Sequence, residues 1–123
     1  RSSDLVLSSL KRYYEAEDYF SIAVQINPEA YEAYYHLGSS LVQLRKYSQA
    51  VEAYKIAMQS DVLDAKLYYD ISYVYAVLKQ NEIAADNLKK AIELNPEFKE
   101  KAKKEAVFQA IIQNSEFRIQ NSE

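Results

Sequence analysis

The fold is decided by one stretch of the chain, YEAYYHLGSSLVQLRKYSQAVEAYKIAMQSDVLD, at residues 31–64. Its apolar and small residues recur at helical spacing in two successive runs. The first run is Tyr34, Leu37, Gly38, Leu41 and Leu44, and the second is Tyr47, Ala50, Tyr54, Ala57 and Met58. Because only Arg45 and Lys46 separate the two runs, we predict two antiparallel amphipathic helices joined by a tight turn.

The same pattern recurs along the chain with a period of 34 residues. The matching sets are Ala16, Ala50 and Ala84; Ala23, Ala57 and Ala91; Leu7, Leu41 and Tyr75; and Leu10, Leu44 and Leu78. A period of this length is typical of two-helix repeats stacked into a solenoid. Asn27-Pro28 and Asn95-Pro96 lie two periods apart and mark junctions between repeats, because Pro cannot continue a helix.

The composition excludes several classes of fold and function. A chain of 123 residues has the length of one domain, and one Gly and two Pro are too few for the turns of a β-sandwich or barrel. The net charge of −3 supplies no field for a phosphate backbone, so we do not expect nucleic acid as a partner. No apolar run approaches the ~18 residues of a membrane-spanning helix, so we expect no membrane insertion.

Residues 31–64 resemble a complete tetratricopeptide repeat, and residues 65–98 resemble a second one. The sites that carry the resemblance in the first of these are Tyr34, Leu37, Gly38, Leu41, Tyr47, Ala50, Tyr54 and Ala57. Residues 1–30 resemble an N-terminally truncated repeat, and residues 99–123 resemble a cap helix with its tail. The resemblance implies a single domain whose fold is an all-α, right-handed superhelical solenoid of antiparallel helix pairs.

The chain departs from the family pattern at the turns inside the repeats. Lys11, Arg45 and Lys79 occupy the position where the family usually ends its first helix with Gly in a left-handed conformation. We therefore expect a left-handed turn at each of the three. Asp4 stands where a small residue is usual, which predicts a frayed first helix in the first repeat.

The C-terminal segment is expected to close the array. Phe108, Ile111 and Ile112 are spaced to form one apolar face, which we expect to cover the helix predicted over residues 82–94. The neighbouring basic run, Lys99, Lys101, Lys103 and Lys104, is expected to be solvated surface.

A second stripe on the first helices of such repeats lines the concave groove that holds a segment of a partner. The corresponding residues here are Tyr35, His36, Ser39, Val42, Lys66, Tyr69, Asp70, Tyr73 and Val77. Tyrosine is enriched at interfaces because it adds contact area at little cost in rotamer entropy. For Tyr35 and Tyr69 the alternative is that they pack against the adjacent repeat, whereas Tyr73 is less usual in the family.

The chain offers no residues for catalysis or for a cofactor. His36 is the only His and Cys is absent, so a catalytic triad, a thiolate site and a His-based metal site lack their members. A single Gly excludes loops that cradle phosphate with several glycines. We therefore expect no enzyme activity, no cofactor and no metal.

These observations predict a non-catalytic protein–protein interaction scaffold that binds a peptide or a partner helix in its concave groove. The alternative is a structural role, as the terminal segment of a longer repeat array that self-associates or spaces other domains. We expect a cytoplasmic location. The chain begins with Arg1 and not with Met, which suggests a piece of a longer polypeptide.

Overall fold

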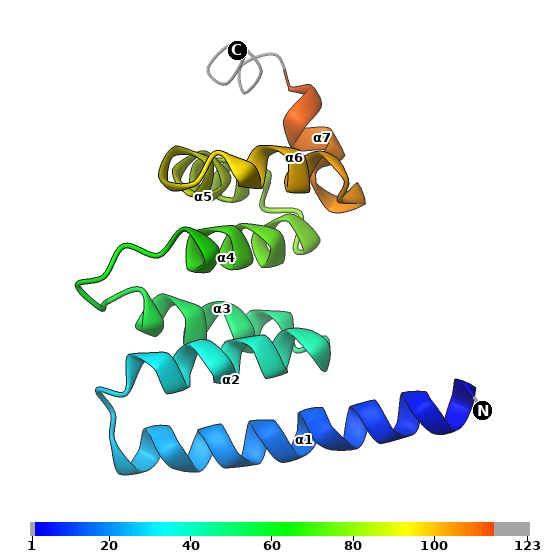
Figure 1. Ribbon diagram of the computed structural model, residues 1–123, viewed down its shortest axis with the longest axis vertical. Helices are drawn as coiled ribbons and strands as arrows, with labels where there is room; N and C mark the ends of the chain where they lie inside the picture. Colours follow the sequence, from blue (N-terminus) through cyan, green and yellow to red (C-terminus); the bar gives the residue numbers. More distant parts are fainter. Residues whose placement is uncertain (1, 115–123) are drawn as a thin grey trace. The chain divides into compact units, whose positions relative to one another are not determined.

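The computed structural model describes residues 2–114, with the side chains from residue 3 onward, and these residues contain helices and no strand (Figure 1). The chain divides into two compact units, Arg1–Asp61 and Val62–Glu123, which are considered separately below. The predicted tail at residues 115–123 lies outside the described residues.

Unit 1 contains α1 (Ser2–Ile26), α2 (Tyr31–Gln43) and α3 (Tyr47–Ala57). The pair α2 and α3 forms as the spacing of residues 31–64 predicts, with Leu41, Ala50 and Ala53 buried between the two helices. The half-buried side chains Tyr34, Leu37 and Val42 pack against this core. The prediction of an antiparallel helix pair in this repeat is confirmed.

The closest approach of α2 and α3 depends on Gly38. A Cβ atom at this position would lie 2.6 Å from the ring of Tyr54, which is closer than side chains tolerate. Tyr54 itself is only 2% exposed, so its ring fills the space that the missing side chain leaves. The single Gly of the chain therefore sets how tightly the two helices pack.

The first repeat differs from its prediction, because α1 runs unbroken through Lys11 for 25 residues. The expected left-handed turn at Lys11 and the expected separate first helix are both wrong. Asp4 and Phe20 occupy the positions that Gly38 and Tyr54 hold one period later. Folding residues 2–10 back as a hairpin would press a carboxylate against the Phe20 ring and remove it from water, so the continuous helix is favoured.

The other two turns are confirmed by their backbone geometry, with φ of 61° at Arg45 and 65° at Lys79. The amide of Lys46 donates to the carbonyl of Leu41 at 2.8 Å, and that of Arg45 donates to the carbonyl of Val42 at 2.9 Å. The turn at Lys79 has the same two bonds, at 2.9 and 3.0 Å. Each turn is thus a Schellman motif in which a residue with a side chain takes the place of Gly.

Unit 2 contains α4 (Ala65–Val77), α5 (Asn81–Leu94), α6 (Glu97–Lys103), a 3₁₀ turn η1 (Ala106–Phe108) and α7 (Gln109–Gln113). Helices α4 and α5 form the second antiparallel pair. The side chain of Asp64 caps α4 by accepting a hydrogen bond from the amide of Lys66 at 2.9 Å. The apolar core includes Ile71, Val74 and Leu88, each at most 1% exposed.

The C-terminal segment closes unit 2 in a different way from the one predicted. Ile111 and Ile112 lie next to α5 as expected, because they line pockets together with residues of that helix. Phe108 is fully buried, and its ring contacts Tyr69 and Tyr73 of α4. The short helix α6 and the turn η1 bring it across to α4, which a single continuous cap helix could not do.

The left-handed turns predict the effect of glycine substitutions. Arg45→Gly and Lys79→Gly should each stabilise the protein by roughly 1 kcal/mol, because a residue with a Cβ is strained at positive φ. Thermal unfolding followed by circular dichroism would show this as a rise of a few degrees in Tm. Lys11→Gly is the matched control, since it should lower the helix content of α1. A rise in Tm for Lys11→Gly would mean that a turn forms there.

The burial of Phe108 predicts that unit 2 depends on its C-terminal segment. Phe108→Ala should lower the free energy of unfolding by about 3–5 kcal/mol, the cost of removing a buried aromatic ring. Lys104→Ala, at an exposed position of the same segment, should change it by less than about 0.5 kcal/mol. Urea denaturation of both variants measures the difference, and equal stabilities would show that η1 does not hold α4.

Candidate partner-binding surface

In unit 1, four rings form a continuous row across the three helices, which we call the aromatic row. Its members are Phe20 of α1, His36 and Tyr35 of α2, and Tyr54 of α3. The centroid of Phe20 lies 5.2 Å from that of the stacked His36 ring, His36 lies 5.4 Å from Tyr35, and Tyr35 lies 5.7 Å from Tyr54. Separations of this size are those of attractive ring pairs, so each ring orients the next.

Polar contacts hold the aromatic row in place. The hydroxyl groups of Ser39 and Tyr54 share a hydrogen bond at 3.1 Å, which ties α2 to α3 beside the row. The Nζ atom of Lys46 lies 3.1 Å from a carboxylate oxygen of Glu17 and 5.5 Å from the centroid of the Tyr14 ring. These contacts fix α1 against the turn between α2 and α3.

The aromatic row is buried at its Tyr54 end and most open at His36, in its middle. Tyr54 is buried, Tyr35 and Phe20 are half-buried, and His36 is exposed. Of the residues predicted for the groove in this unit, Tyr35, His36 and Ser39 therefore lie together around the row. Val42 is different, since it packs against the core of α2 and α3. The open part of the row offers flat apolar faces with polar edges, which suits contact with another polypeptide.

In unit 2, Tyr69 is buried, and the prediction that it faces an open groove is wrong. It is 2% exposed, with its ring stacked on Phe98 at 4.7 Å and edge-on to Phe108 at 5.5 Å. The Nζ atom of Lys101 lies 5.0 Å from its centroid. The alternative of packing is thus the one that holds for Tyr69, although it packs under the C-terminal segment.

The hydroxyl group of Tyr69 shares this enclosed environment. Its oxygen is buried without a hydrogen-bond partner of acceptable geometry among the described residues. Burial raises the pKa of Tyr69 far above that of a free tyrosine, and the negative charges of Glu105 and Asp70 raise it further. The phenol therefore stays neutral and serves packing.

The other residues predicted on α4 are partly covered as well. Tyr73 is half-buried, with its ring 6.2 Å from that of Phe108. Asp70 pairs with Lys66, whose Nζ lies 3.1 Å from its carboxylate oxygen. Val77 lines a small pocket of about 220 Å³ with Ala106, Val107 and Ala110 among its other walls. The chain's own segment 105–110 thus occupies part of the face that sequence reasoning left open for a partner.

Sequence reasoning missed the aromatic residues that complete both clusters. Phe20 and Tyr54 were assigned to the core pattern, yet they carry the two ends of the aromatic row. Lys101 belongs to a run predicted to be solvated, but its amino group lies over Tyr69 and, at 5.8 Å, over Phe98. The repeat period gives no signal for these contacts, because Phe98 is the last residue of the last complete repeat and Lys101 and Phe108 come after it.

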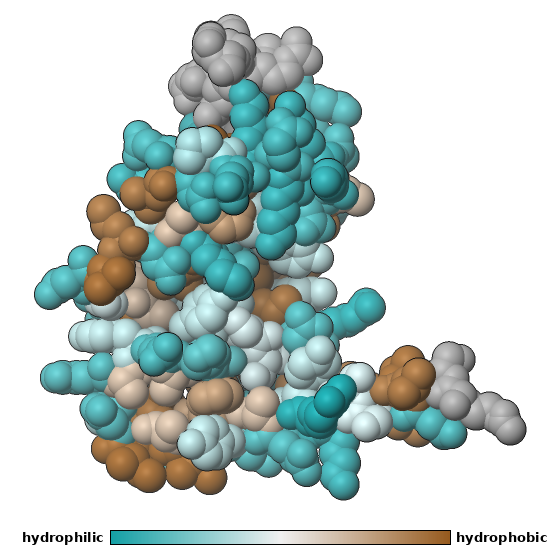
Figure 2. Space-filling model, viewed as in Figure 1, coloured by the Kyte–Doolittle hydropathy of each residue, from teal (hydrophilic) through white to brown (hydrophobic). Residues whose placement is uncertain are grey.

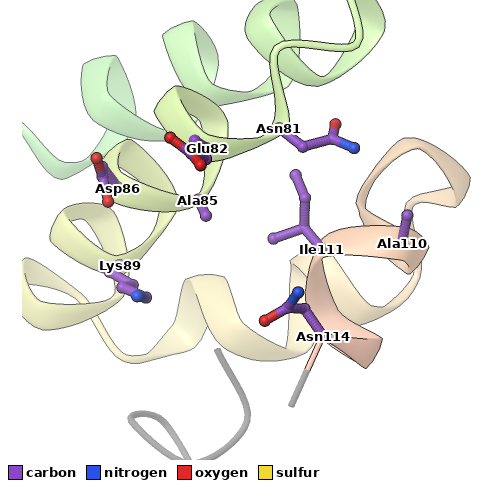
Figure 3. Close-up of a pocket in the computed structure, with 8 residues that line it drawn as sticks. All are labelled: Asn81, Glu82, Ala85, Asp86, Lys89, Ala110, Ile111 and Asn114. Atoms are coloured by element: carbon purple, nitrogen blue, oxygen red, sulfur yellow. The ribbon is translucent and has the colours of Figure 1, made fainter. Parts of the chain in front are cut away.

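A larger pocket of about 410 Å³ lies between α5 and α7 (Figure 3). Its walls are Asn81, Glu82, Ala85, Asp86, Lys89, Ala110, Ile111 and Asn114. Charges of both signs alternate around it with small apolar side chains. No cluster of metal-ligating side chains occurs in the part of the chain that the structure describes. Within the same part, every helix is too short or too polar to cross a bilayer.

The chain matches the family model described as "Tetratricopeptide repeat" over residues 6–61 and 35–97. Among curated proteins it is 33% identical over 98 residues to the human protein O-mannosyl-transferase TMTC3. This match covers 79% of the chain but 11% of the relative, so the chain corresponds to a small part of that protein.

Solved structures agree with this assignment. YrrB, described as a TPR protein with an unusual peptide-binding site, superimposes with a TM-score of 0.66 and 27% identity over 74% of this chain and 47% of its own. MamA superimposes with a TM-score of 0.70 and 22% identity over 88% of this chain and 57% of its own, a likeness of fold alone. The chain therefore belongs to the tetratricopeptide repeat family and has its all-α, right-handed solenoid fold.

Proposed function

We propose that this chain is a non-catalytic protein–protein interaction scaffold that binds a peptide or partner helix against α2, over the aromatic row. Family membership supports the general role, since tetratricopeptide repeats are protein-interaction scaffolds. The observation that carries the more specific proposal is the aromatic row itself. Contacts within unit 1 hold its rings in place, while Tyr35 is half-buried and His36 is exposed. Fixed aromatic side chains give contact area with little loss of conformational entropy.

The proposal places the binding surface in unit 1. On α4 the groove tyrosines Tyr69 and Tyr73 are engaged by Phe98 and Phe108, whereas His36 and Tyr35 contact rings of the aromatic row itself. The groove residues predicted in unit 2 are not part of this proposal; they are Lys66, Asp70, Tyr73 and Val77. The peptide-binding description of YrrB, a relative by fold and sequence, is consistent with a peptide as the ligand.

No feature of the described residues favours an enzyme. The likeness to a mannosyl-transferase covers 11% of that protein and consists of repeat sequence, so its activity does not transfer to this chain. Shared repeat sequence accounts for this match without any catalytic group.

Selection of peptides from a displayed random library on the purified chain tests the proposal. Peptides selected on the wild type should bind the variant Tyr35→Ser, His36→Ser at least about 10-fold more weakly, because truncating aromatic anchors typically costs 1–2 kcal/mol or more. Titration calorimetry with the selected peptides measures the change. Circular dichroism should show the same helix content for both proteins.

Tyr73→Ser is the matched control, since it removes a half-buried tyrosine from the corresponding helix of unit 2. It should leave peptide affinity within about 2-fold of the wild type, in the range of a residue away from the interface. An equal or larger loss with Tyr73→Ser would move the site to α4. Failure to select any peptide would refute peptide binding.

A further inference from the structure

One side of α1 carries a regular stripe that is only partly covered within unit 1. We call it the α1 stripe, and its members alternate in spacing by four and three residues: Leu5, Ser9, Arg12, Ala16, Tyr19, Ala23 and Ile26. This spacing keeps side chains on one face of a helix over its full length. The residues that contact α2 and the turn after it, such as Glu17 and Phe20, lie on the adjoining face, and the ring of Phe20 meets that of Tyr19 edge-on at 5.1 Å.

The large members of the stripe are unusually open to solvent. Leu5 and Tyr19 are 68% exposed and Ile26 is 79% exposed. Figure 2 shows apolar surface gathered at both ends of α1. Exposed apolar side chains aligned along one side of a helix are typical of a helix that meets another helix.

The repeat itself shows that this face is one that helices cover. Ala50, Ala53 and Ala57 of α3 are each at most 5% exposed, and Ala50 and Ala53 belong to the core between α2 and α3. Ala16, Tyr19 and Ala23 are their counterparts one period earlier, yet here Tyr19 is exposed and the two alanines are only half-buried. The missing cover cannot be residues 2–10, because they continue α1 in a straight line (Figure 1).

The stripe is complementary to itself in the antiparallel direction. Small residues recur every seventh position at Ser9, Ala16 and Ala23, and larger ones at Leu5, Arg12, Tyr19 and Ile26. An antiparallel copy centred near residue 14 sets Leu5 against Ala23, Ser9 against Tyr19 and Arg12 against Ala16. Every layer then joins a large side chain to a small one, which lets two helices approach closely without voids.

The charges fit the same alignment. In it, Arg12 of one copy lies beside Glu15 of the other, and two-fold symmetry repeats this pair on the other side of the axis. A guanidinium and a carboxylate placed across an interface favour one orientation of the helices over others. Parallel helices in register would instead place Arg12 next to Arg12.

We propose that α1 pairs antiparallel with α1 of a second copy of this chain through the α1 stripe, forming a symmetric dimer. At 1.5 Å per residue the helix is about 37 Å long. One pair of helices buries less than the roughly 1,200–2,000 Å² of a standard stable interface, so the dimer dissociates on dilution. The two rings proposed to contact a peptide, Tyr35 and His36, lie on α2 and not on α1, so this inference does not rest on the proposed function.

Sedimentation equilibrium over a range of concentrations tests the proposal. The wild type should show a reversible monomer–dimer equilibrium, and Tyr19→Lys should raise the dimer dissociation constant at least about 10-fold by burying a charge. Gln25→Lys, at an exposed position of α1 off the stripe, is the matched control and should leave the constant within about 2-fold. A wild type that stays monomeric at all concentrations overturns the proposal.

The charge pair provides a test by rescue. Arg12→Glu should weaken the dimer, and the doubly substituted Arg12→Glu, Glu15→Arg should restore it, because the pair is re-formed with its signs exchanged. Weakening without rescue would show that Arg12 and Glu15 do not face each other across the two copies.

Cysteine cross-linking decides the orientation, since the chain has no Cys of its own. A mixture of Leu5→Cys and Ala23→Cys chains should form a mixed disulfide under mild oxidation, whereas Leu5→Cys alone should not, because its counterpart lies more than about 20 Å away in this alignment. Disulfides within Leu5→Cys alone would indicate parallel helices. Absence of cross-links in a protein that dimerises would place the interface elsewhere.

Discussion

The structure depends on how closely two antiparallel helices can approach at one crossing point in each repeat. In the repeat of residues 31–64 the crossing brings Gly38 next to the ring of Tyr54, and a single added Cβ would collide with that ring. In the repeat of residues 65–98 the same positions hold Ser72 and Leu88, both fully buried. In the truncated repeat of residues 1–30 they hold Asp4 and Phe20, and the hairpin does not close. One pair of positions thus decides whether a repeat forms a hairpin or extends as a single helix.

This constraint also explains why the sequence predicts some elements well and others poorly. The helices from Tyr31 to Leu94 follow from apolar spacing, because each has a partner helix on which that spacing can pack. The turns at Arg45 and Lys79 follow from their place in the repeat, and their φ angles confirm them. Lys11 has the same position in its repeat, but no turn forms there because two helices could not approach closely at Asp4 and Phe20. Only the pairing of Asp4 with Phe20 indicates that no turn forms at Lys11. Asp4 lies close to the N-terminal end of α1.

The candidate site also shows where prediction from the repeat period fails. The spacing placed Tyr69 in the groove stripe, yet its ring is covered by Phe98, Lys101 and Phe108. Phe98 ends the last repeat and the other two residues follow it, where no period constrains the path of the chain. The aromatic row was missed in part because Phe20 and Tyr54 serve both the core and the surface, whereas the pattern assigns each residue to only one of them.

The enclosed phenol of Tyr69 also makes unit 2 optically distinct. The chain has twelve Tyr and no Trp, so its near-ultraviolet absorbance comes mainly from phenols, which change their spectrum when they ionise in alkali. Because the pKa of Tyr69 is raised in the folded state, ionisation opposes folding there, and the stability that Tyr69 contributes falls as pH rises above about 10. Tyr69 therefore remains a phenol until the contacts made by Phe98 and Phe108 open. Its late ionisation would be a built-in spectroscopic marker of whether the C-terminal segment is in place.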